Sequence, residues 1–182
     1  MAITLVLCVG SVLVIGLLAD KSEDTKKAAA KITVVEPATL GGRAKLENAE
    51  FAEVTKTMKA GLLKEYPGAT QSVGAFYGDP AKKNMVMAIG VAAPIPNPKL
   101  ELSKNFTNLT LTGITAESVT DVDAGPLGGV AKCGDSTISG MDVAICAWTD
   151  DGSVGVFFWY NASKSSVEKE FVSLRSQLEK TG

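Results

Sequence analysis

Hydrophobic and charged positions divide the chain into three parts. Residues 2–19 carry no charged side chain, and residues 20–31 contain both acidic and basic groups. From residue 32 onward, apolar residues recur at the spacings of helices and strands, with turn signals between them. This pattern predicts a transmembrane anchor at residues 1–19, a charged stalk at residues 20–31 and a folded domain at residues 32–182.

The anchor is one of three interpretations of the apolar run. Its 18 residues would span about 27 Å as a helix, close to the ~30 Å hydrocarbon core of a bilayer. A cleaved signal peptide normally has basic residues before the run and a small-x-small site after it. Here no Lys or Arg comes first, and Leu17-Leu18-Ala19 is a poor site. A buried core helix is unusual for a terminal segment without a polar face. We therefore expect residues 2–19 to lie in the lipid bilayer.

The side of the membrane on which the domain lies is harder to predict. Lysines follow the apolar run but do not precede it, at Lys21, Lys26, Lys27 and Lys31. The positive-inside rule would then keep the domain in the cytoplasm, whereas the cysteine pair described below favours an oxidising compartment. A basic segment upstream of Met1 would reconcile the two indications. We expect a single-pass plasma-membrane protein whose domain faces the extracytoplasmic side.

Helical spacing predicts a helix near each end of the domain. Asn48 can cap the first helix, and Ser165 with Glu168 has the spacing of a capping box for the last. Apolar residues then recur every three or four positions in both segments. They are Phe51, Val54, Met58 and Leu62 in the first helix, and Val167, Phe171, Leu174 and Leu178 in the last. Pro67-Gly68 ends the first helix.

The segments between these helices have the shorter period of strands. Residues 69–77 and 84–92 are joined by the turn signal Gly78-Asp79-Pro80. Both segments carry apolar residues on both faces, so both should be largely covered. Asn97-Pro98 can begin a short helix through Phe106. Further strands are predicted at residues 112–122, 130–133, 143–148 and 154–160.

The last two strands form the clearest hairpin. Asp151-Gly152 lies between them, and Asp-Gly accepts the positive φ that tight turns require. Bulky residues at 157–160 occupy both faces of the final strand, which predicts a central position in the sheet. The chain is therefore expected to be α+β, with an antiparallel β-sheet of about six strands packed with two or three helices.

Composition narrows the function without identifying it. The chain has 182 residues, 18 basic and 20 acidic side chains, no histidine and two arginines, Arg43 and Arg175. The lack of histidine excludes Ser-His-Asp and Cys-His catalysis and histidine metal sites. A near-neutral charge argues against nucleic-acid binding, which needs a basic face. We expect the bilayer and an unidentified protein or small molecule as partners, and no cofactor.

Cys133 and Cys146 lie on two neighbouring predicted strands. Opposed β-carbons of paired strands are about 5 Å apart, close to disulfide geometry. The alternative is two buried reduced thiols in a cytosolic protein. Neighbouring strands behind a membrane anchor favour a disulfide, and hence an oxidising compartment. Two thiols without histidine disfavour a metal site.

Several segments of the domain resemble one known family. They are residues 123–133 (DAGPLGGVAKC), 143–148 (VAICAW) and 150–155 (DDGSVG), with shorter matches at 37–42 and 77–80. They resemble a family of uncharacterised single-pass membrane proteins of actinobacteria such as Streptomyces, over about residues 36–180. Many members carry a proline-rich cytoplasmic segment before the anchor, which this chain lacks. Where the family usually has His-Gly, this chain has Asp151-Gly152. The resemblance implies a location and a fold but no activity.

Two groups of residues invite a functional interpretation. Acidic residues recur at Asp121, Asp123, Asp135, Asp142, Asp150 and Asp151. Their spacing matches no calcium loop, and aspartate is a common turn residue. Trp148, Phe157 and Trp159 could line an apolar ligand groove, although aromatic residues on strands are more often core. No catalytic, cofactor-binding or metal-binding residue is predicted.

These features favour a membrane-anchored extracytoplasmic domain with a non-enzymatic binding or structural function at the cell envelope. One alternative is a secreted or membrane-tethered hydrolase-type enzyme using Ser, Asp or Lys chemistry. It predicts a deep pocket that gathers Asp121, Asp123 or Lys132 with a serine. A second alternative is an extracytoplasmic sensor domain. An apolar groove would instead favour ligand binding, and a flat surface would favour a protein partner.

Overall fold

The computed structural model describes residues 31–182. The predicted anchor at residues 1–19, and the stalk except for its last residue, lie outside the described residues. Within residues 31–182, no helix is long and apolar enough to cross a membrane. This part of the chain is α+β, as predicted, with a six-stranded antiparallel sheet and three α-helices.

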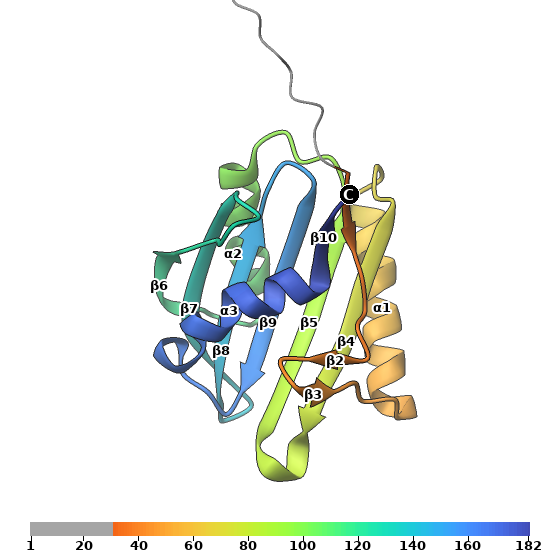
Figure 1. The fold of residues 1–182 in the computed structure, drawn as a ribbon. Coiled ribbons are helices and arrows are strands. Elements are labelled where there is room, and N and C mark those ends of the chain that lie inside the picture. The colour runs from red at the N-terminus through yellow and green to blue at the C-terminus, as the bar shows by residue number, and fades with distance from the viewer. Residues whose placement is uncertain (1–30) are drawn as a thin grey trace, which may run out of the picture.

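The six-stranded sheet forms the centre of the domain (Figure 1). Its strand order is β4-β5-β9-β8-β7-β6. The strands are β4 (Gln71–Asp79), β5 (Asn84–Ala92), β6 (Glu117–Val122), β7 (Val130–Ile138), β8 (Met141–Thr149) and β9 (Ser153–Tyr160). The predicted central position of the last strand is confirmed, because β9 pairs with β5 on one side and β8 on the other.

Short polar side chains shape the turns of two hairpins. Asp150 Oδ1 accepts hydrogen bonds from the backbone N–H groups of Gly152 at 2.8 Å and Ser153 at 2.7 Å. Asp79 Oδ1 likewise accepts from Ala81 N at 3.0 Å, where β4 turns into β5. Such bonds let aspartate stabilise a turn locally. The predicted β8–β9 hairpin is therefore confirmed.

The two faces of the sheet are covered by different elements (Figure 1). Helix α3 (Lys164–Leu178) lies across one face, and α1 (Ala49–Glu65) and α2 (Pro98–Leu111) lie on the other. Two small antiparallel pairs accompany α3. They are β1 (Ile32–Val34) with β10 (Glu179–Thr181), and β2 (Thr39–Leu40) with β3 (Arg43–Ala44).

Strand alternation divides the core into two layers. Phe157 belongs to the cluster beneath α3, which also contains Trp148 and Phe171. Phe158, the next residue, belongs to the cluster on the opposite face with Phe76. Successive side chains of a strand point to opposite faces, so a bulky run such as that in β9 supplies both layers. Each layer is then completed by its own helices.

The predicted caps of α1 and α2 are confirmed. Asn48 Oδ1 accepts a hydrogen bond from Phe51 N at 2.9 Å, and Asn97 Oδ1 accepts from Leu100 N at 3.1 Å. Each bond satisfies a backbone donor that has no partner within the first helical turn. Helix α2 extends to Leu111, beyond the predicted end.

The predicted capping box of α3 is wrong. The helix begins at Lys164, and its N-cap residue Ser163 makes no side-chain cap hydrogen bond. Instead, Asp135 Oδ1 on β7 accepts a hydrogen bond of 2.6 Å from Lys164 N. A carboxylate suits the positive end of a helix, so a distant strand supplies the cap that Ser165 and Glu168 were expected to form.

The two ends of the described chain lie side by side (Figure 1). Strand β1 pairs with β10, and Ile32 is opposite Thr181. Val35 N also donates a hydrogen bond to Leu178 O at 2.8 Å. The strand at 179–181 was not predicted, because its three residues have no strand pattern of their own.

Candidate functional site

An apolar cavity of about 470 Å³ lies between α1 and α2, and the sheet forms its floor. Met58 and Leu62 of α1 and Leu109 of α2 contribute to its walls. The floor includes Met87 and Ile89 from β5, and Val156 and Phe158 from β9. The volume lies within the range of about 300–1,000 Å³ that is typical of small-molecule sites. We call this cavity the α1–α2 groove.

Two floor residues stay partly exposed although they lie on interior strands of the sheet. Ile89 of β5 is directly opposite Val156 of β9, and each is only half-buried. Their neighbours on the same face, Met87 and Phe158, are buried. Helices normally cover the apolar face of a sheet. Here α1 and α2 lie to either side, so the centre of the face is available to a ligand.

Two hydrogen bonds join the helices beside the groove. The Tyr66 hydroxyl donates to Glu101 Oε1 at 2.6 Å, and Asn108 Nδ2 donates to Glu65 Oε1 at 3.2 Å. Burial, together with the hydrogen bond to Glu101, raises the pKa of Tyr66 well above its usual value. The hydroxyl therefore keeps the proton that it donates. Both contacts constrain the separation of α1 and α2.

Most polar side chains of the groove are already engaged. Glu65 and Asn108 bond to each other, and Thr112 Oγ1 donates to the Leu109 carbonyl at 2.8 Å. Asn105 also lines the groove and is half-buried. Its side chain makes no hydrogen bond within residues 31–182. The site is thus an apolar hollow with one unengaged amide.

The structure places Trp148, Phe157 and Trp159 in the core instead of a ligand groove. All three are at most 2% exposed and pack beneath α3. The ring centroids of Trp148 and Phe157 are 5.0 Å apart, and those of Phe157 and Trp159 are 5.3 Å apart. These residues alternate along their strands with the groove-facing ones, so they point to the opposite face. The three residues are therefore core residues, which was the alternative interpretation of their pattern.

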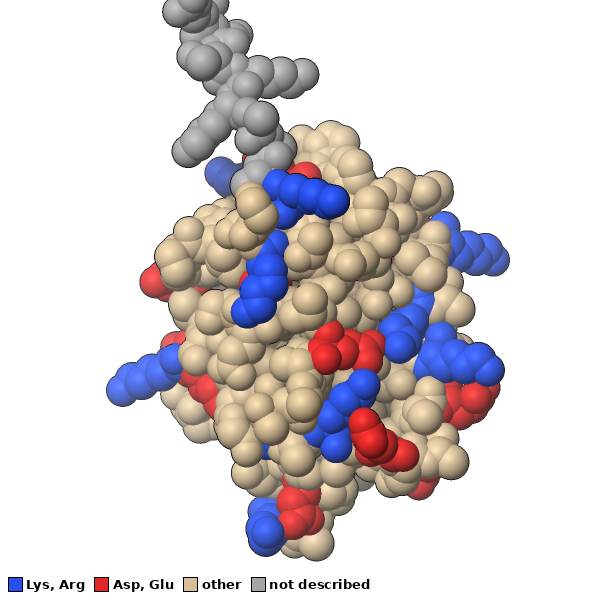
Figure 2. Space-filling view, turned by 45° about the vertical axis from the view of Figure 1, so that its right-hand side comes forward, with Lys and Arg blue, Asp and Glu red and all other residues tan. Residues whose placement is uncertain are grey.

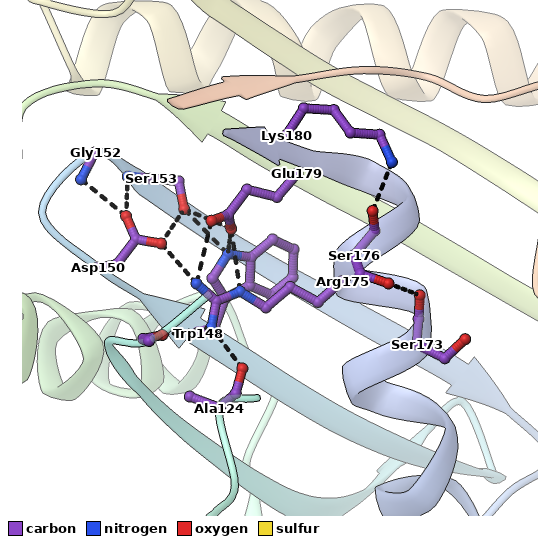
Figure 3. Close-up of polar contacts among 11 residues, drawn as sticks. Ala124, Trp148, Asp150, Gly152, Ser153, Ser173, Arg175, Ser176, Glu179 and Lys180 are labelled. Atoms are coloured by element: carbon purple, nitrogen blue, oxygen red, sulfur yellow. Dashed lines mark hydrogen bonds and ion pairs between the residues drawn. The ribbon is translucent and has the colours of Figure 1, made fainter. Parts of the chain in front are cut away.

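A cluster of charged side chains is buried beneath α3, near its C-terminal end (Figure 3). Arg175, Asp150 and Glu179 are each at most 4% exposed. Arg175 Nη2 donates to Asp150 Oδ2 at 2.6 Å, and Arg175 Nε donates to Glu179 Oε2 at 3.1 Å. Trp148 Nε1 and the Ser153 hydroxyl also donate to Glu179 Oε2, at 2.7 Å and 2.9 Å. One cation therefore faces two carboxyl groups inside the core.

The guanidinium of Arg175 also holds a loop. Its Nη1 donates to the carbonyl oxygens of Ala124 at 2.8 Å and Gly128 at 2.7 Å. Burial raises the pKa of Glu179, hydrogen bonds from Arg175 oppose this, and the neighbouring Asp150 raises the pKa again, so the net direction is upward. The cluster lies too deep for a substrate to touch. We therefore assign it to the stability of the domain.

Of the acidic residues noted in the sequence, Asp135 and Asp142 line one cavity of about 250 Å³ together with Glu117, and the other four do not line it. Asp121 is exposed and pairs on the surface with Lys132, at 3.2 Å. Asp123 Oδ1 accepts a hydrogen bond from Gly125 N at 2.8 Å and so stabilises a turn. Asp121 and Asp123 therefore make separate local contacts in the described part of the chain. Residues 31–182 contain no group of three or more carboxylates or thiols placed to hold a metal ion.

Cys133 and Cys146 form a disulfide that joins β7 to β8, which confirms the predicted pairing. The two residues are directly opposed in the strand register, and their Cα atoms are 4.1 Å apart. Both are fully buried in the cluster beneath α3. The disulfide therefore stabilises the half of the sheet that carries the loop at residues 123–129 and the Asp135 cap of α3.

The sequence offers no direct signal for the α1–α2 groove. Ile89 and Val156 belong to strands that are apolar on both faces, a pattern that predicts complete cover. Whether a helix covers these residues depends on where the helix packs in the folded chain, which no local pattern shows.

Comparison with models of known families, with curated proteins and with solved structures finds no match to this chain.

Proposed function

We propose that this protein is a single-pass membrane protein whose extracytoplasmic domain binds an apolar small molecule in the α1–α2 groove. The observation that carries the proposal is the half-buried pair Ile89 and Val156 on the floor of an apolar cavity of about 470 Å³. Apolar surface gains about 25 cal/mol for each Å² removed from water. A ligand that covers this pair would therefore be bound mainly by the hydrophobic effect.

The proposed location combines the sequence with the covalent structure. Residues 2–19 have the length and lack of charge of a spanning helix. The Cys133–Cys146 disulfide favours an oxidising compartment, and this supports an extracytoplasmic position for the domain. The motif resemblance to actinobacterial membrane proteins supports the same arrangement. Residues 20–31 would then link the bilayer to β1.

The charge distribution of the surface supports a small ligand over a nucleic acid. Figure 2 shows acidic and basic side chains interspersed over one face of the domain. Glu36, for example, forms ion pairs with both Lys45 at 2.7 Å and Lys59 at 3.0 Å. Nucleic-acid binding needs a continuous basic face.

Photolabelling of the full chain in lipid nanodiscs tests the proposal. The probe is an octanol that carries a diazirine, and mass spectrometry of the digest identifies the labelled peptides. We expect saturable labelling of peptides that contain Leu62, Leu109 or Val156, because these side chains line the groove. Labelling confined to residues 2–19, or labelling that does not saturate, would refute the proposal.

Gly61 provides a matched pair of variants. It lines the groove on α1, and a Cβ built there meets no atom within 4 Å. Gly61→Trp therefore places a bulky side chain in the groove without a clash with the backbone. Gly61→Ala makes the same backbone change and leaves the groove open. We expect Gly61→Trp to lose the saturable labelling and Gly61→Ala to retain it.

A further inference from the structure

We infer that the α1–α2 groove selects an uncharged membrane lipid. Its acyl chain would lie over Ile89 and Val156, and its ester or hydroxyl oxygen would hydrogen-bond to Asn105. This inference rests on the proposed function and names the ligand class for the same site. Two observations support it, the charge of the lining and the unengaged amide, and the proposed anchor supplies a third argument.

The charge of the lining disfavours an anionic ligand. Among the described residues, Glu65 is the charged residue that lines the groove, and no Lys or Arg lines it. The Glu65 carboxylate already accepts a hydrogen bond from Asn108. An ionised fatty acid would bring a second negative charge into a poorly hydrated site without a counter-charge, which is unfavourable. The polar part of the ligand should therefore be neutral.

The amide of Asn105 favours a ligand with one hydrogen-bonding oxygen. An asparagine side chain offers both donors and an acceptor, and within residues 31–182 this one is bound to no other group. A pure hydrocarbon would displace water from the amide and leave its hydrogen bonds unmade, which weakens binding. A hydroxyl or ester oxygen replaces the lost water. Asn105 is thus the specificity-determining residue of the groove.

The proposed anchor makes the bilayer the nearest source of such a molecule. The 12 residues at 20–31 reach at most about 40 Å when fully extended. Strand β1 starts at Ile32, which lies against Gly152 of the β8–β9 turn. Ala93 N and Ile95 N, just before α2, donate hydrogen bonds to that same turn at 3.0 Å and 2.9 Å. The stalk therefore joins the domain at the end where α2 begins. We expect this connection to keep the groove within reach of the membrane.

Matched photoreactive lipids test the inference on the full chain in nanodiscs. The first is a monoacylglycerol, the second is the alkyl sulfate and the third is the alkane, all with the same chain length and diazirine position. We expect the monoacylglycerol to label the groove peptides about threefold to tenfold more than the alkane, the range that one net hydrogen bond supports. We expect the alkyl sulfate to label them least.

Two leucine substitutions on α2 separate specificity from stability. Asn105→Leu removes the amide but keeps the groove apolar, so the ratio of monoacylglycerol to alkane labelling should fall to about one. Thr107→Leu is the matched control, because Thr107 is exposed and does not line the groove. The control should keep the wild-type ratio.

The outcomes distinguish the inference from the function on which it rests. Equal labelling by the sulfate, or an unchanged ratio in Asn105→Leu, would overturn the lipid assignment. Saturable labelling by the octanol probe would still support the α1–α2 groove as an apolar site. If neither the lipids nor the octanol label the groove, both proposals fail.

Discussion

Arg175 on α3 donates a hydrogen bond of 2.6 Å to Asp150 in the β8–β9 turn, and both side chains are almost completely excluded from water. The pair joins the last helix to the hairpin next to which β1 begins. Glu179 completes the cluster from the start of β10. Loss of one member of a buried ion pair is costly, because the remaining charge keeps its desolvation penalty without a partner.

Arg175→Met should therefore destabilise the domain by about 3–5 kcal/mol. Urea unfolding of the full chain in detergent, followed by tryptophan fluorescence, measures the change. Arg43→Met is the matched control, because Arg43 pairs with Glu170 in a partly exposed site. We expect the control to lose less than about 1 kcal/mol. Equal losses in the two variants would show that burial of the cluster has no special importance.

Glu179→Gln should remove a pH dependence of stability. The pKa of Glu179 is raised in the folded domain, through burial and the nearby Asp150 despite hydrogen bonds from Arg175. The folded state then binds the proton more tightly than the unfolded state, whose value is about 4.3. This contribution is present at low pH and is lost as the pH rises through the folded pKa. The unfolding free energies of wild type and Glu179→Gln would be measured at pH values from the unfolded pKa to above the folded pKa of Glu179. The stability of the wild type relative to the variant should fall as the pH rises.

Cys133→Ser should lower the melting temperature. A disulfide whose cysteines are 13 residues apart contributes about 3 kcal/mol by restricting the unfolded chain, roughly 10 °C for a domain of this size. Calorimetry of the full chain measures the shift, and reduction of the wild type should reproduce it. Cys8→Ser, in the apolar run, should leave the transition unchanged. A variant that melts like the wild type would contradict a stabilising role for the bond.

Two glycines should respond to alanine with opposite signs. Gly61 lies in α1 with open space around its Cβ position, so Gly61→Ala should stabilise by about 0.5–1 kcal/mol through helix propensity. Gly129 has φ +82°, and a Cβ there would lie 2.7 Å from Asp150 Cβ. Gly129→Ala should therefore destabilise. Melting temperatures that move in the same direction would contradict the assigned conformations.

Asp135→Ala should destabilise α3 although Asp135 lies on β7. It removes the acceptor for Lys164 N, at a cost of about 1 kcal/mol. Ser165→Ala is the control, because Ser165 makes no hydrogen bond to the helix backbone within the described residues. Urea unfolding should leave Ser165→Ala within about 0.5 kcal/mol of the wild type. A larger effect of Ser165→Ala than of Asp135→Ala would favour the sequence-based capping box.

Local patterns predicted most of the elements around the site. The helix that begins after Asn48, the helix that begins at Pro98 and the β8–β9 hairpin follow from caps and turn residues close in sequence. The pairing of Cys133 with Cys146 also follows, because two adjacent strands joined by a short connection bring opposed residues together. Each of these features depends on residues within about one hairpin of each other.

Features that depend on distant residues were missed. The cap of α3 comes from Asp135, and β10 exists because β1, at the other end of the described chain, pairs with it. Arg175 is buried between two carboxyl groups, and one of them, Asp150, comes from the β8–β9 turn. Glu179 lies only four residues after Arg175. Asp150 lies 25 residues before Arg175, so no local pattern can reveal that contact.

The sequence by itself determined the α+β class, the alternation that fills both faces of β9, and the disulfide. These features follow from the sequence because the spacing of apolar residues and the residues preferred in turns specify helices, strands and hairpins within short stretches of chain. Only the tertiary structure decided that Trp148, Phe157 and Trp159 are covered while Ile89 and Val156 remain half-buried. Both sets of residues are equally apolar in sequence. What separates them is that α3 packs directly over one face, whereas α1 and α2 pack to either side on the other and leave a groove.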